Sequence, residues 1–478
     1  MSFMWTVAML IIALVVVRIS HWLFRWSNPT CNGKLPPGSM GFPIIGESID
    51  FCKPHRFDGI SPFLKKRMLK YGPLFRTNIF GSHTIVSTDS DVNLEILRQE
   101  NKSFILSYPE VLVKRLGKDS LVSKDGNIHK HMKKITHQHL LGSEGLKQKM
   151  IRDMDRVTRE HLESKADSGI LDVRDSVASL VVALMAPKMI SSLKPETQKK
   201  FMEDIKAFNF DWFQLSFTIS GWEFLYKAFR AHRDGTKLIK DVLTKRKMVG
   251  EKYGDFLDTM LEELEKEGCF WNQDSAANHI FFMSFAFQET TPKATCLAVK
   301  FLSENPKVVA ELKREHEAIL ESREDKESGI TWEEYRQKMS FTNMVINETL
   351  RLINFVPFLF RKAVNDVEIK GYTIPAGWIV FVAAQVVHYD PKTYENPFEF
   401  NPWRWERQDL RSGSKMFMGF GGGVRQCVGA EFARLQMAIF LHYLVTTYEF
   451  SMAEDCAVLR KPGLLFHKDL SINISRLK

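Results

Sequence analysis

The sequence predicts a mainly α-helical chain with small β-sheets, preceded by one transmembrane helix. Three observations carry this prediction. Apolar residues recur with a helical period, separated by charged residues, over residues 126–350. Alternating patterns typical of strands are confined to residues 73–88 and 367–382. The first 26 residues are almost uninterruptedly apolar.

Residues 1–26 are expected to form an uncleaved membrane anchor. The segment is nearly long enough to cross a bilayer as a helix, and Arg18, Trp22 and Trp26 suit the headgroup region near its end. Positive charges follow the apolar run instead of preceding it, which disfavours a cleaved signal peptide. The positive-inside rule then predicts that the rest of the chain is cytoplasmic.

Residues 27–50 are expected to form a hinge, and residues 51–478 a single body. The stretch 35–43 is rich in proline and glycine and has no helical period, which predicts a stiff connection after the anchor. Residues 390–425 also carry prolines and a glycine cluster, which predicts an irregular ordered loop. No internal repeat or change of composition marks another domain boundary.

Composition narrows the classes of function. The net charge of +9 comes from scattered basic residues, which suits an anionic membrane or an acidic protein partner better than nucleic acid, with an ordinary solvated surface as the open alternative. The six cysteines are far apart and form no CxxC pair, which is typical of reduced thiols. A hydrophobic content of 44% permits a large core with room for an apolar ligand.

One cysteine lies where its thiolate is favoured. Cys427 belongs to the glycine-rich segment 420–429, and a segment with helical character begins at Ala430. A helix N-terminus and the guanidinium of Arg425 both favour the ionised sulfur. Glycines in this segment allow a flat cofactor to approach the backbone.

Segment 420–429, FGGGVRQCVG, resembles the haem-binding signature of the cytochrome P450 family. It matches every defined position, namely Phe420, Gly421, Gly423, Arg425, Cys427 and Gly429. The resemblance implies the cytochrome P450 fold, a bound haem b, Phe420 and Arg425 as cofactor contacts, and Cys427 as the axial ligand of the haem iron. Thiolate ligation favours cleavage of the O–O bond, so the resemblance implies oxygen activation.

Two further motifs resemble a structural triad of the family. Glu348 and Arg351 match its Glu-x-x-Arg helix, and Arg404 lies in segment 400–405, which resembles its Phe-x-Pro-x-Arg-Trp element. The resemblance implies that these three side chains form a buried network behind the cysteine.

The resemblance also implies contacts to the haem propionates. Arg361 and Arg425 match propionate-binding positions, and a guanidinium is suited to bind a carboxylate with two hydrogen bonds. The family's Trp-x-x-x-Arg helix is replaced here by His129 and Lys133. These two are therefore candidate propionate ligands, while a solvated helix face is the open alternative.

On the oxygen side, residues 286–291 (AFQETT) resemble the family motif Ala/Gly-Gly-x-Asp/Glu-Thr-Thr. The resemblance implies that Glu289 and Thr290 are the catalytic pair that delivers protons. Phe287 replaces the usual glycine, so it either points away from the haem, narrows the pocket or weakens oxygen activation. The expected substrate pocket comprises Ala286, Phe287, Phe355, Val356, Phe358 and Leu359, with the loop from Phe104 to Asp125 as another wall.

Within the family the resemblance is closest to plant enzymes that oxidise steroids and terpenoids, including triterpene hydroxylases of the thalianol type. It implies a monooxygenase of the endoplasmic reticulum membrane that hydroxylates an apolar terpenoid, with a triterpene alcohol as the expected substrate, using O2 and electrons from NADPH. The electrons would come through NADPH-cytochrome P450 reductase, for which the candidate docking residues are Lys130, Lys134, Lys415 and Arg434. The alternatives are a steroid or diterpenoid hormone as substrate, hydroperoxide rearrangement without a reductase, and a haem-binding paralogue with weak turnover.

Overall fold

The computed structural model describes residues 2–478 except 110–112, 114–115, 118, 209–218, 407–412, 455, 462, 467, 469 and 478. The chain divides into two compact units whose segments alternate along the sequence. Unit 1 comprises Met1–Lys53, Ile60–Ser107 and Phe358–Val387, and unit 2 comprises Pro54–Gly59, Tyr108–Pro357 and His388–Lys478. The domain boundaries predicted after residues 26 and 50 stay a prediction.

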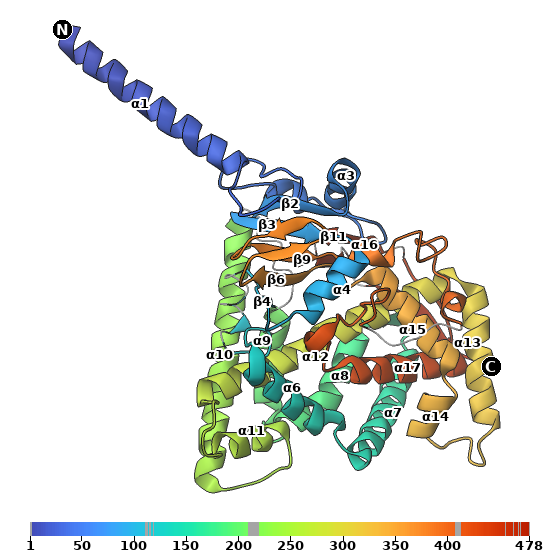
Figure 1. The fold of residues 1–478 in the computed structure, drawn as a ribbon. Coiled ribbons are helices and arrows are strands. Elements are labelled where there is room, and N and C mark those ends of the chain that lie inside the picture. The colour runs from blue at the N-terminus through green and yellow to red at the C-terminus, as the bar shows by residue number, and fades with distance from the viewer. Residues whose placement is uncertain are drawn as a thin grey trace. The chain divides into compact units, whose positions relative to one another are not determined.

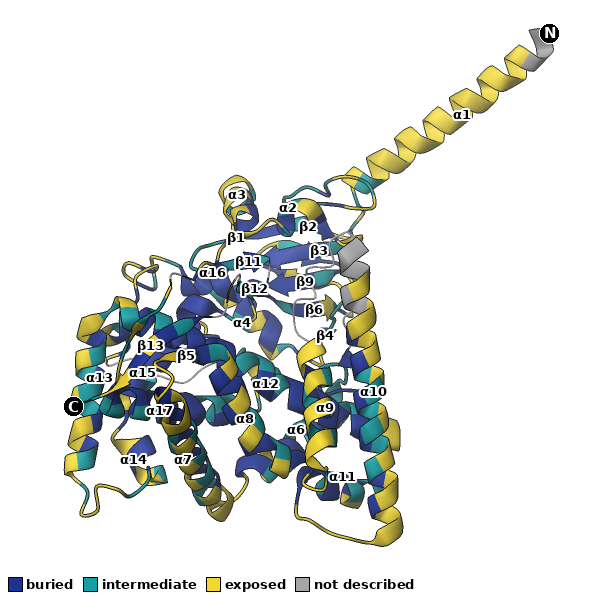
Figure 2. Cartoon of the chain, turned by 180° about the vertical axis from the view of Figure 1, so that it is seen from behind, coloured by how far each residue is buried: buried dark blue, intermediate teal, exposed yellow. Residues whose placement is uncertain are grey.

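Unit 1 begins with the predicted N-terminal helix, α1 (Ser2–Ser27). Its segment Trp5–Ser27 is the one helix in the described part of the chain that is long and apolar enough to cross a membrane. Figure 2 shows α1 exposed from Trp5 up to the half-buried Trp26. A membrane anchor explains this exposure, because apolar side chains of a helix in water would otherwise pack against protein.

A five-stranded sheet forms the core of unit 1 (Figure 1). Its strands, in spatial order, are β2 (Leu74–Ile79), β3 (Ser82–Ser87), β9 (Ile379–Val382), β6 (Leu359–Ala363) and β4 (Phe104–Leu106). Only the β3–β9 pair is parallel. The other elements of the unit are α2 (Ser48–Phe51), α3 (Pro62–Tyr71), α4 (Ser90–Arg98) and the hairpin of β7 (Val367–Ile369) and β8 (Tyr372–Ile374), while α16 (Ala384–His388) ends at the first residue of unit 2.

The hairpin predicted over residues 73–88 is confirmed as β2 and β3. Its two-residue turn has positive φ at both positions, 53° at Phe80 and 77° at Gly81. This geometry matches the twist of the strands, but it is unusual for a bulky residue such as Phe80.

Unit 2 is mainly helical, as the periodicity over residues 126–350 predicted. Its longest helix, α12 (Gln273–Glu304), begins with a capping box at Asn272 and is buried on nearly every side. Such a helix belongs to the core of a large protein. The other helices are α6 (Gly126–Leu141), α7 (Glu144–Ala166), α8 (Val173–Met189), α9 (Pro195–Ala207), α10 (Ile219–Val249), α11 (Phe256–Leu264), α13 (Pro306–Glu321), α14 (Trp332–Gln337), α15 (Ser340–Ile353) and α17 (Ala430–Thr447).

Two small antiparallel sheets of unit 2 were not predicted. One comprises β1 (His55–Arg56), β11 (Val458–Lys461) and β12 (Gly463–Phe466), and the other β10 (Tyr448–Met452), β13 (Ser471–Arg476) and β5 (Ile170–Asp172). Strands this short offer few alternating positions, and their partners are distant in sequence. The predicted irregular loop over residues 390–425 holds, in its described part, only the short turns η2 (Pro402–Trp405) and η3 (Gly423–Arg425).

Candidate functional site

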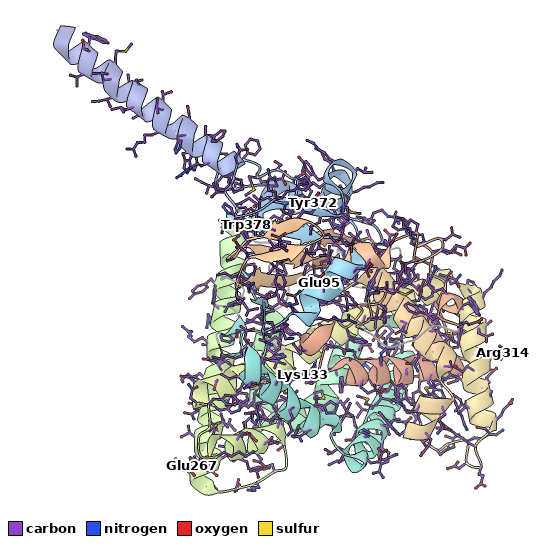
Figure 3. All side chains as sticks on the ribbon, in the orientation of Figure 1. Glu95, Lys133, Glu267, Arg314, Tyr372 and Trp378 are labelled. Carbon is purple, nitrogen blue, oxygen red and sulfur yellow. The ribbon has the colours of Figure 1, made fainter. Side chains whose placement is uncertain are left out.

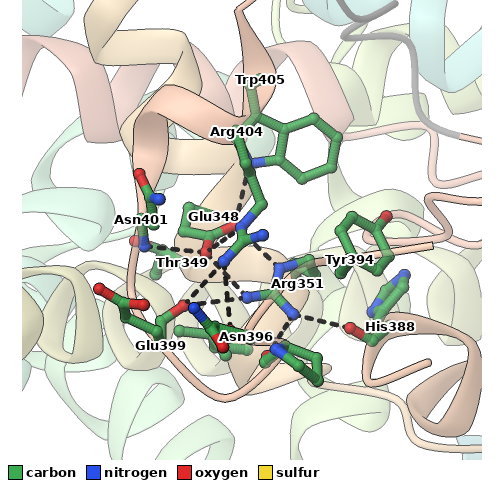
Figure 4. Close-up of polar contacts among 12 residues, drawn as sticks. Glu348, Thr349, Arg351, His388, Tyr394, Asn396, Glu399, Asn401, Arg404 and Trp405 are labelled. Carbon is green, nitrogen blue, oxygen red and sulfur yellow. Dashed lines mark hydrogen bonds and ion pairs between the residues drawn. The ribbon is translucent and has the colours of Figure 1, made fainter. Parts of the chain in front are cut away.

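A buried charge network in unit 2 joins α15 to η2 (Figure 4). Glu348 accepts two hydrogen bonds from the guanidinium of Arg351, both at 2.8 Å. It accepts a third at 2.8 Å from Nε of Arg404, and two more from the Asn401 backbone N–H and the Trp405 indole. Because Glu348 and Arg351 are fully buried, each depends on these partners to offset the loss of water.

The remaining donors of the two arginines bind backbone carbonyls of the following loop. Arg351 donates to the carbonyls of His388 and Pro397 at 2.7 Å, and Arg404 to that of Glu395 at 2.8 Å. These bonds hold the loop at three of its carbonyl groups. The structure therefore brings together Glu348, Arg351 and Arg404, as the resemblance implied, and adds the indole of Trp405.

The network continues along the chain toward Cys427. The Met418 backbone N–H donates to Nε2 of His388 at 2.9 Å, and the Cys427 N–H donates to the carbonyl of Phe420 at 3.0 Å. Burial lowers the pKa of His388 to about 3, so the imidazole is neutral and able to accept. The loop that carries the cysteine is thus held by a side-chain acceptor at Met418 and by a backbone bond between Cys427 and Phe420.

The thiol of Cys427 is accessible, although protein surrounds it. Its side chain is exposed, yet desolvation raises its pKa, against the opposing effects of the Gly429 backbone N–H and the charge of Lys133. The predicted helix start at Ala430 is confirmed, since Gly429 is the N-cap of α17.

Lys133 is the cation that acts on the sulfur. It lies on α6 (Figure 3), and its Nζ donates to the carbonyl of Val424 at 3.0 Å. Desolvation lowers the pKa of Lys133, and the thiolate of Cys427 raises it. Arg425, for which this role was predicted, instead pairs with Asp125 and donates to the carbonyl of Lys124 at 2.8 Å.

The other predicted propionate ligands are also placed by protein contacts. His129 is buried on α6. Arg361 belongs to unit 1, where it is buried on β6 and pairs with Glu100 at 2.5 Å. The carboxylates of Asp125 and Glu100 hold the guanidinium groups that the resemblance assigned to propionates, so these arginines already have carboxylate partners.

Three neighbouring residues of α12 are accessible while the helix around them is buried. Between residues 279 and 299 only Ala286, Glu289 and Thr290 are not fully buried. We call these three residues the α12 window. The hydroxyl of Thr290 donates to the Ala286 carbonyl at 2.9 Å, and the carboxylate of Glu289 pairs with Lys293 one turn further on. These are the residues that the resemblance implied for the oxygen side.

A polar cavity of about 290 Å³ reaches this part of α12. Its lining includes Glu289 and Lys293 from α12, Arg174 and Asp175 from α8, and Lys206 from α9. Lys206 pairs with Asp175 at 3.0 Å, and both side chains are exposed. The carboxylate of Glu289 therefore lies where water and mobile charges reach it, which a proton-relaying group requires.

Phe287 is buried against α17 and the Cys427 loop. It is 5% exposed, and its ring centroid lies 4.9 Å from that of Phe432 on α17. A Cβ on Gly429 would lie 3.9 Å from both the Cys427 sulfur and Cε1 of Phe287. The ring thus packs beside the cysteine loop, and which of the three predicted outcomes applies to Phe287 stays a prediction.

The remaining pocket candidates differ in burial. Phe355 is half-buried and Val356 is exposed in unit 2, whereas Leu359 is half-buried on β6 of unit 1. Phe358 is 3% exposed and packs on Phe51 and Phe381, so its ring belongs to the core of unit 1. The predicted wall from residue 104 to 125 lies partly outside the described residues.

Arg434 does not fit the predicted docking surface for a reductase. Its guanidinium donates to Asn347 and lies 5.2 Å from the centroid of the Phe420 ring. These contacts give it a structural role behind the cysteine loop. Lys130, Lys134 and Lys415 are exposed, as docking requires.

The sequence did not reveal several partners that shape this site. Asp125 and His388 are distant in sequence from Arg425 and Met418, and no pattern connects them. Lys293 is different, because its spacing of four residues from Glu289 on one helix was visible.

The residues present fit a thiolate-ligated haem. Cys427 offers an accessible sulfur with an N–H donor and a nearby cation. Gly421 and Gly423 adopt positive φ, 73° and 66°, which forms a turn without side chains beside the sulfur. A planar apolar cofactor fits against such a backbone.

Comparisons with known proteins agree with this fit. A chain of Arabidopsis thaliana named Cytochrome P450 708A2 is 59% identical over 476 residues, covering 100% of both chains. Cucurbitadienol 11-hydroxylase of Siraitia grosvenorii is 35% identical, covering 99% of both chains, and beta-amyrin 16-alpha-hydroxylase of Maesa lanceolata is 34% identical, covering 99% of both.

A solved structure shows the same fold. The retinoic acid-bound cyanobacterial CYP120A1 superposes with a TM-score of 0.78 at 23% identity, covering 93% of this chain and 100% of that one. The Cytochrome P450 family model matches residues 36–472. The chain therefore belongs to the cytochrome P450 family.

Proposed function

We propose that this P450 monooxygenase hydroxylates a triterpene alcohol. The observation that carries the proposal is the contact of α12 with the Cys427 loop at Phe287, next to the α12 window in sequence, together with relatives whose names give cucurbitadienol and beta-amyrin as substrates. Both compounds are triterpene alcohols, which are apolar and rigid. The names of other relatives, 33–34% identical to this chain, give steroids, which are the main alternative class of substrate.

Cys427 is proposed to hold haem b, with Phe420 and Arg425 in the same loop and His129, Lys133 and Arg361 as candidate propionate contacts. Bound haem would supply oxygen activation at a thiolate-ligated iron. Desolvation raises the pKa of Cys427, while the Gly429 N–H, which donates to the sulfur, and the positive charge of Lys133 oppose that rise. Phe355, Val356 and Leu359 remain candidates for the substrate pocket.

Glu289 and Thr290 are proposed to deliver protons on the oxygen side. The hydroxyl of Thr290 holds its proton on the Ala286 carbonyl, from which it can rotate to donate elsewhere. Glu289, the neighbouring residue on the helix, lines the polar cavity and pairs with Lys293. Each group thus has a resting partner that it must leave in order to act.

The redox partner is proposed to be NADPH-cytochrome P450 reductase at the endoplasmic reticulum membrane, with the body of the enzyme on the cytoplasmic side. The exposed Lys130, Lys134 and Lys415 offer positive charge to an acidic flavin domain. Dependence of product formation on NADPH separates this proposal from hydroperoxide rearrangement, which uses no reductase.

Co-expression with a panel of triterpene-forming cyclases and a plant reductase tests the proposal. Mass spectrometry should find a triterpene alcohol carrying one added oxygen, and the Cys427→Ser variant should yield none. Oxidation of a steroid panel with no triterpene product would establish the alternative substrate class. Spectral binding of triterpenes with rapid reduction and no product would establish the binding paralogue.

A further inference from the structure

Gln288 of α12 is a buried amide whose polar atoms lack protein partners. The residue is 8% exposed. Among the residues that the structure describes, neither the carbonyl oxygen nor the NH2 group of its side chain has a hydrogen-bond partner. Burying an amide costs free energy unless hydrogen bonds replace those that it made to water. The amide is therefore expected to bind a ligand of its own.

Two cavities meet at Gln288. One is the polar cavity of about 290 Å³ that Glu289 and Lys293 also line. The other has a volume of about 20 Å³ and lies among α8, α9 and α12, where both α8 and α9 pack against α12 (Figure 1). Of the described residues, only Gln288 lines both cavities. Its amide therefore lies at the boundary between them.

The small cavity has the size and the polar groups for one water molecule. A cavity of roughly 10–15 Å³ suffices for a water, which also needs several polar partners. Besides Gln288, the lining offers the amide of Gln198 on α9 and the hydroxyl of Ser284, one turn earlier on α12. That hydroxyl donates to the Ile280 carbonyl at 2.9 Å, so its oxygen can still accept. A water bound to these groups would fix the orientation of the Gln288 amide.

Gln288 and Glu289 can influence each other only through the polar cavity. Successive residues of a helix point about 100° apart, so the two side chains do not face each other. Both nevertheless line the same cavity, which reaches the surface at the exposed pair of Lys206 and Asp175. Because charges of both signs line this cavity, water is the ligand that suits it. That water can contact the carboxylate and the amide at once.

The reaction needs a supply of protons at this place. Each hydroxylation converts the substrate, one O2, a pair of electrons and a pair of protons into the hydroxylated product and one water. A carboxylate that gives up a proton must therefore take up another before it acts again. An amide does not titrate, but it donates and accepts hydrogen bonds, and so it can orient a water beside the carboxylate.

We propose that Gln288 is a positioning residue for proton delivery. Its amide is fixed from the small cavity and orients the water in the polar cavity that returns protons to Glu289. This inference rests on the proposed relay through Glu289 and Thr290, and it gives a role to the variable position of that motif. An apolar side chain of the same length would fill the site if packing were the only requirement.

Gln288→Met tests the inference, because methionine keeps the length of the side chain and removes its strong hydrogen-bonding groups. The full haem-loaded chain is assayed with reductase on the substrate that the cyclase and steroid panels identify. Product per NADPH should fall about fivefold, the factor that corresponds to one typical hydrogen bond, and the lost electrons should appear as hydrogen peroxide. The solvent isotope effect on product formation in D2O should rise. Unchanged product per NADPH and an unchanged isotope effect would overturn the inference.

Turnover driven by added hydrogen peroxide separates proton supply from packing. Hydrogen peroxide brings the electrons and the protons with the oxygen, so Gln288→Met should form product from it as fast as the parent. Haem content and spectral binding of the substrate should also match the parent. If peroxide-driven turnover falls as far as NADPH-driven turnover, the substitution disturbs the pocket, and the inference is overturned.

Two further variants act as controls. Gln288→Asn keeps the amide and should restore part of the coupling, because a second water can bridge the missing methylene. Gln436→Met is the matched control, since Gln436 is a fully buried glutamine of α17, and it should leave product per NADPH unchanged. An equal loss of coupling in Gln436→Met would show that removal of any buried amide has this effect and would overturn the inference.

Glu289→Gln, assayed in parallel, separates failure of the inference from failure of the relay. If Glu289→Gln loses coupling while Gln288→Met keeps it, the relay stands and only the inference is overturned. If Glu289→Gln retains the coupling of the parent, the relay itself is wrong, and the role of Gln288 falls with it.

Discussion

Glu348 and Glu289 are both helical carboxylates with a basic partner on the same helix, but their surroundings differ. Glu348 is fully buried and accepts five hydrogen bonds from four residues. Glu289 is 14% exposed, pairs with Lys293 and lines a polar cavity. One carboxylate is enclosed by its partners, and the other has a partner that it can exchange.

This difference suits Glu348 to a structural role and Glu289 to a chemical one. A carboxylate that holds five donors in a buried site cannot change partners without leaving several groups unpaired, so it fixes a loop. A proton-relaying carboxylate must change partners, and for this it requires access to water. The network behind Cys427 therefore positions the sulfur, while the α12 window is suited to move protons.

Replacement of Glu348 should have the largest effect. Glu348→Ala leaves Arg351 and Arg404 buried without their carboxylate, at a cost of about 3–5 kcal/mol, which should release the cysteine loop. We expect little haem per mole of purified protein by pyridine haemochromogen assay. Glu289→Gln is the matched control and should retain full haem. Full haem content in Glu348→Ala would show that Glu348, like Glu289, is not needed to hold the cysteine loop.

Removal of the Thr290 hydroxyl should have the next largest effect. Thr290→Ala should lower the rate of product formation on the order of a hundredfold, at the lower limit for a general acid–base group. NADPH consumption should continue, so product per NADPH should fall as well. Haem content should stay unchanged, and Thr290→Ser should restore most of the coupling. If Thr290→Ala forms as much product per NADPH as the parent, another group delivers the protons.

The sequence predicted the residues that belong to motifs but not the contacts that depend on tertiary packing. The triad and Cys427 were predictable because each belongs to a motif of fixed spacing. Asp125, which pairs with Arg425, was not, because 300 residues separate the two. Nor was the direction of the Phe287 side chain, which depends on where Phe432 lies in the packed unit. Motifs name the residues of a site, whereas tertiary packing determines where each one points.

Acidification should lower the stability of the enzyme through buried His388, which accepts a hydrogen bond from Met418. Burial holds its pKa at about 3, against 6.5 when unfolded. Above pH 6.5 the ring is neutral in both states, but below it only the unfolded chain takes up a proton until the pH nears 3. The unfolding free energy should therefore fall by about 1.4 kcal/mol per pH unit in this range.

His388→Gln should lose this part of the pH dependence, because a glutamine oxygen accepts from Met418 without titrating. Thermal unfolding followed by haem absorbance at pH 5.5 and 7 measures the difference between parent and variant. Other buried histidines, such as His279 and His442, contribute equally to both proteins. Equal slopes would show that His388 takes up its proton in the folded enzyme.

The smallest effect should come from Phe287. It contrasts a buried and an accessible residue within a single turn of α12. Phe287 is packed on Phe432, while its neighbour Ala286 belongs to the accessible window. Phe287→Leu should lower stability by about 1 kcal/mol, mainly through loss of the aromatic pair, and leave the ratio of oxidised products unchanged. Ala286→Val should do the opposite, changing substrate binding and product ratio with little effect on stability. If Phe287→Leu alone shifts the product ratio, the ring reaches the substrate, and the boundary between packed and reactive faces of α12 lies one residue further along the helix.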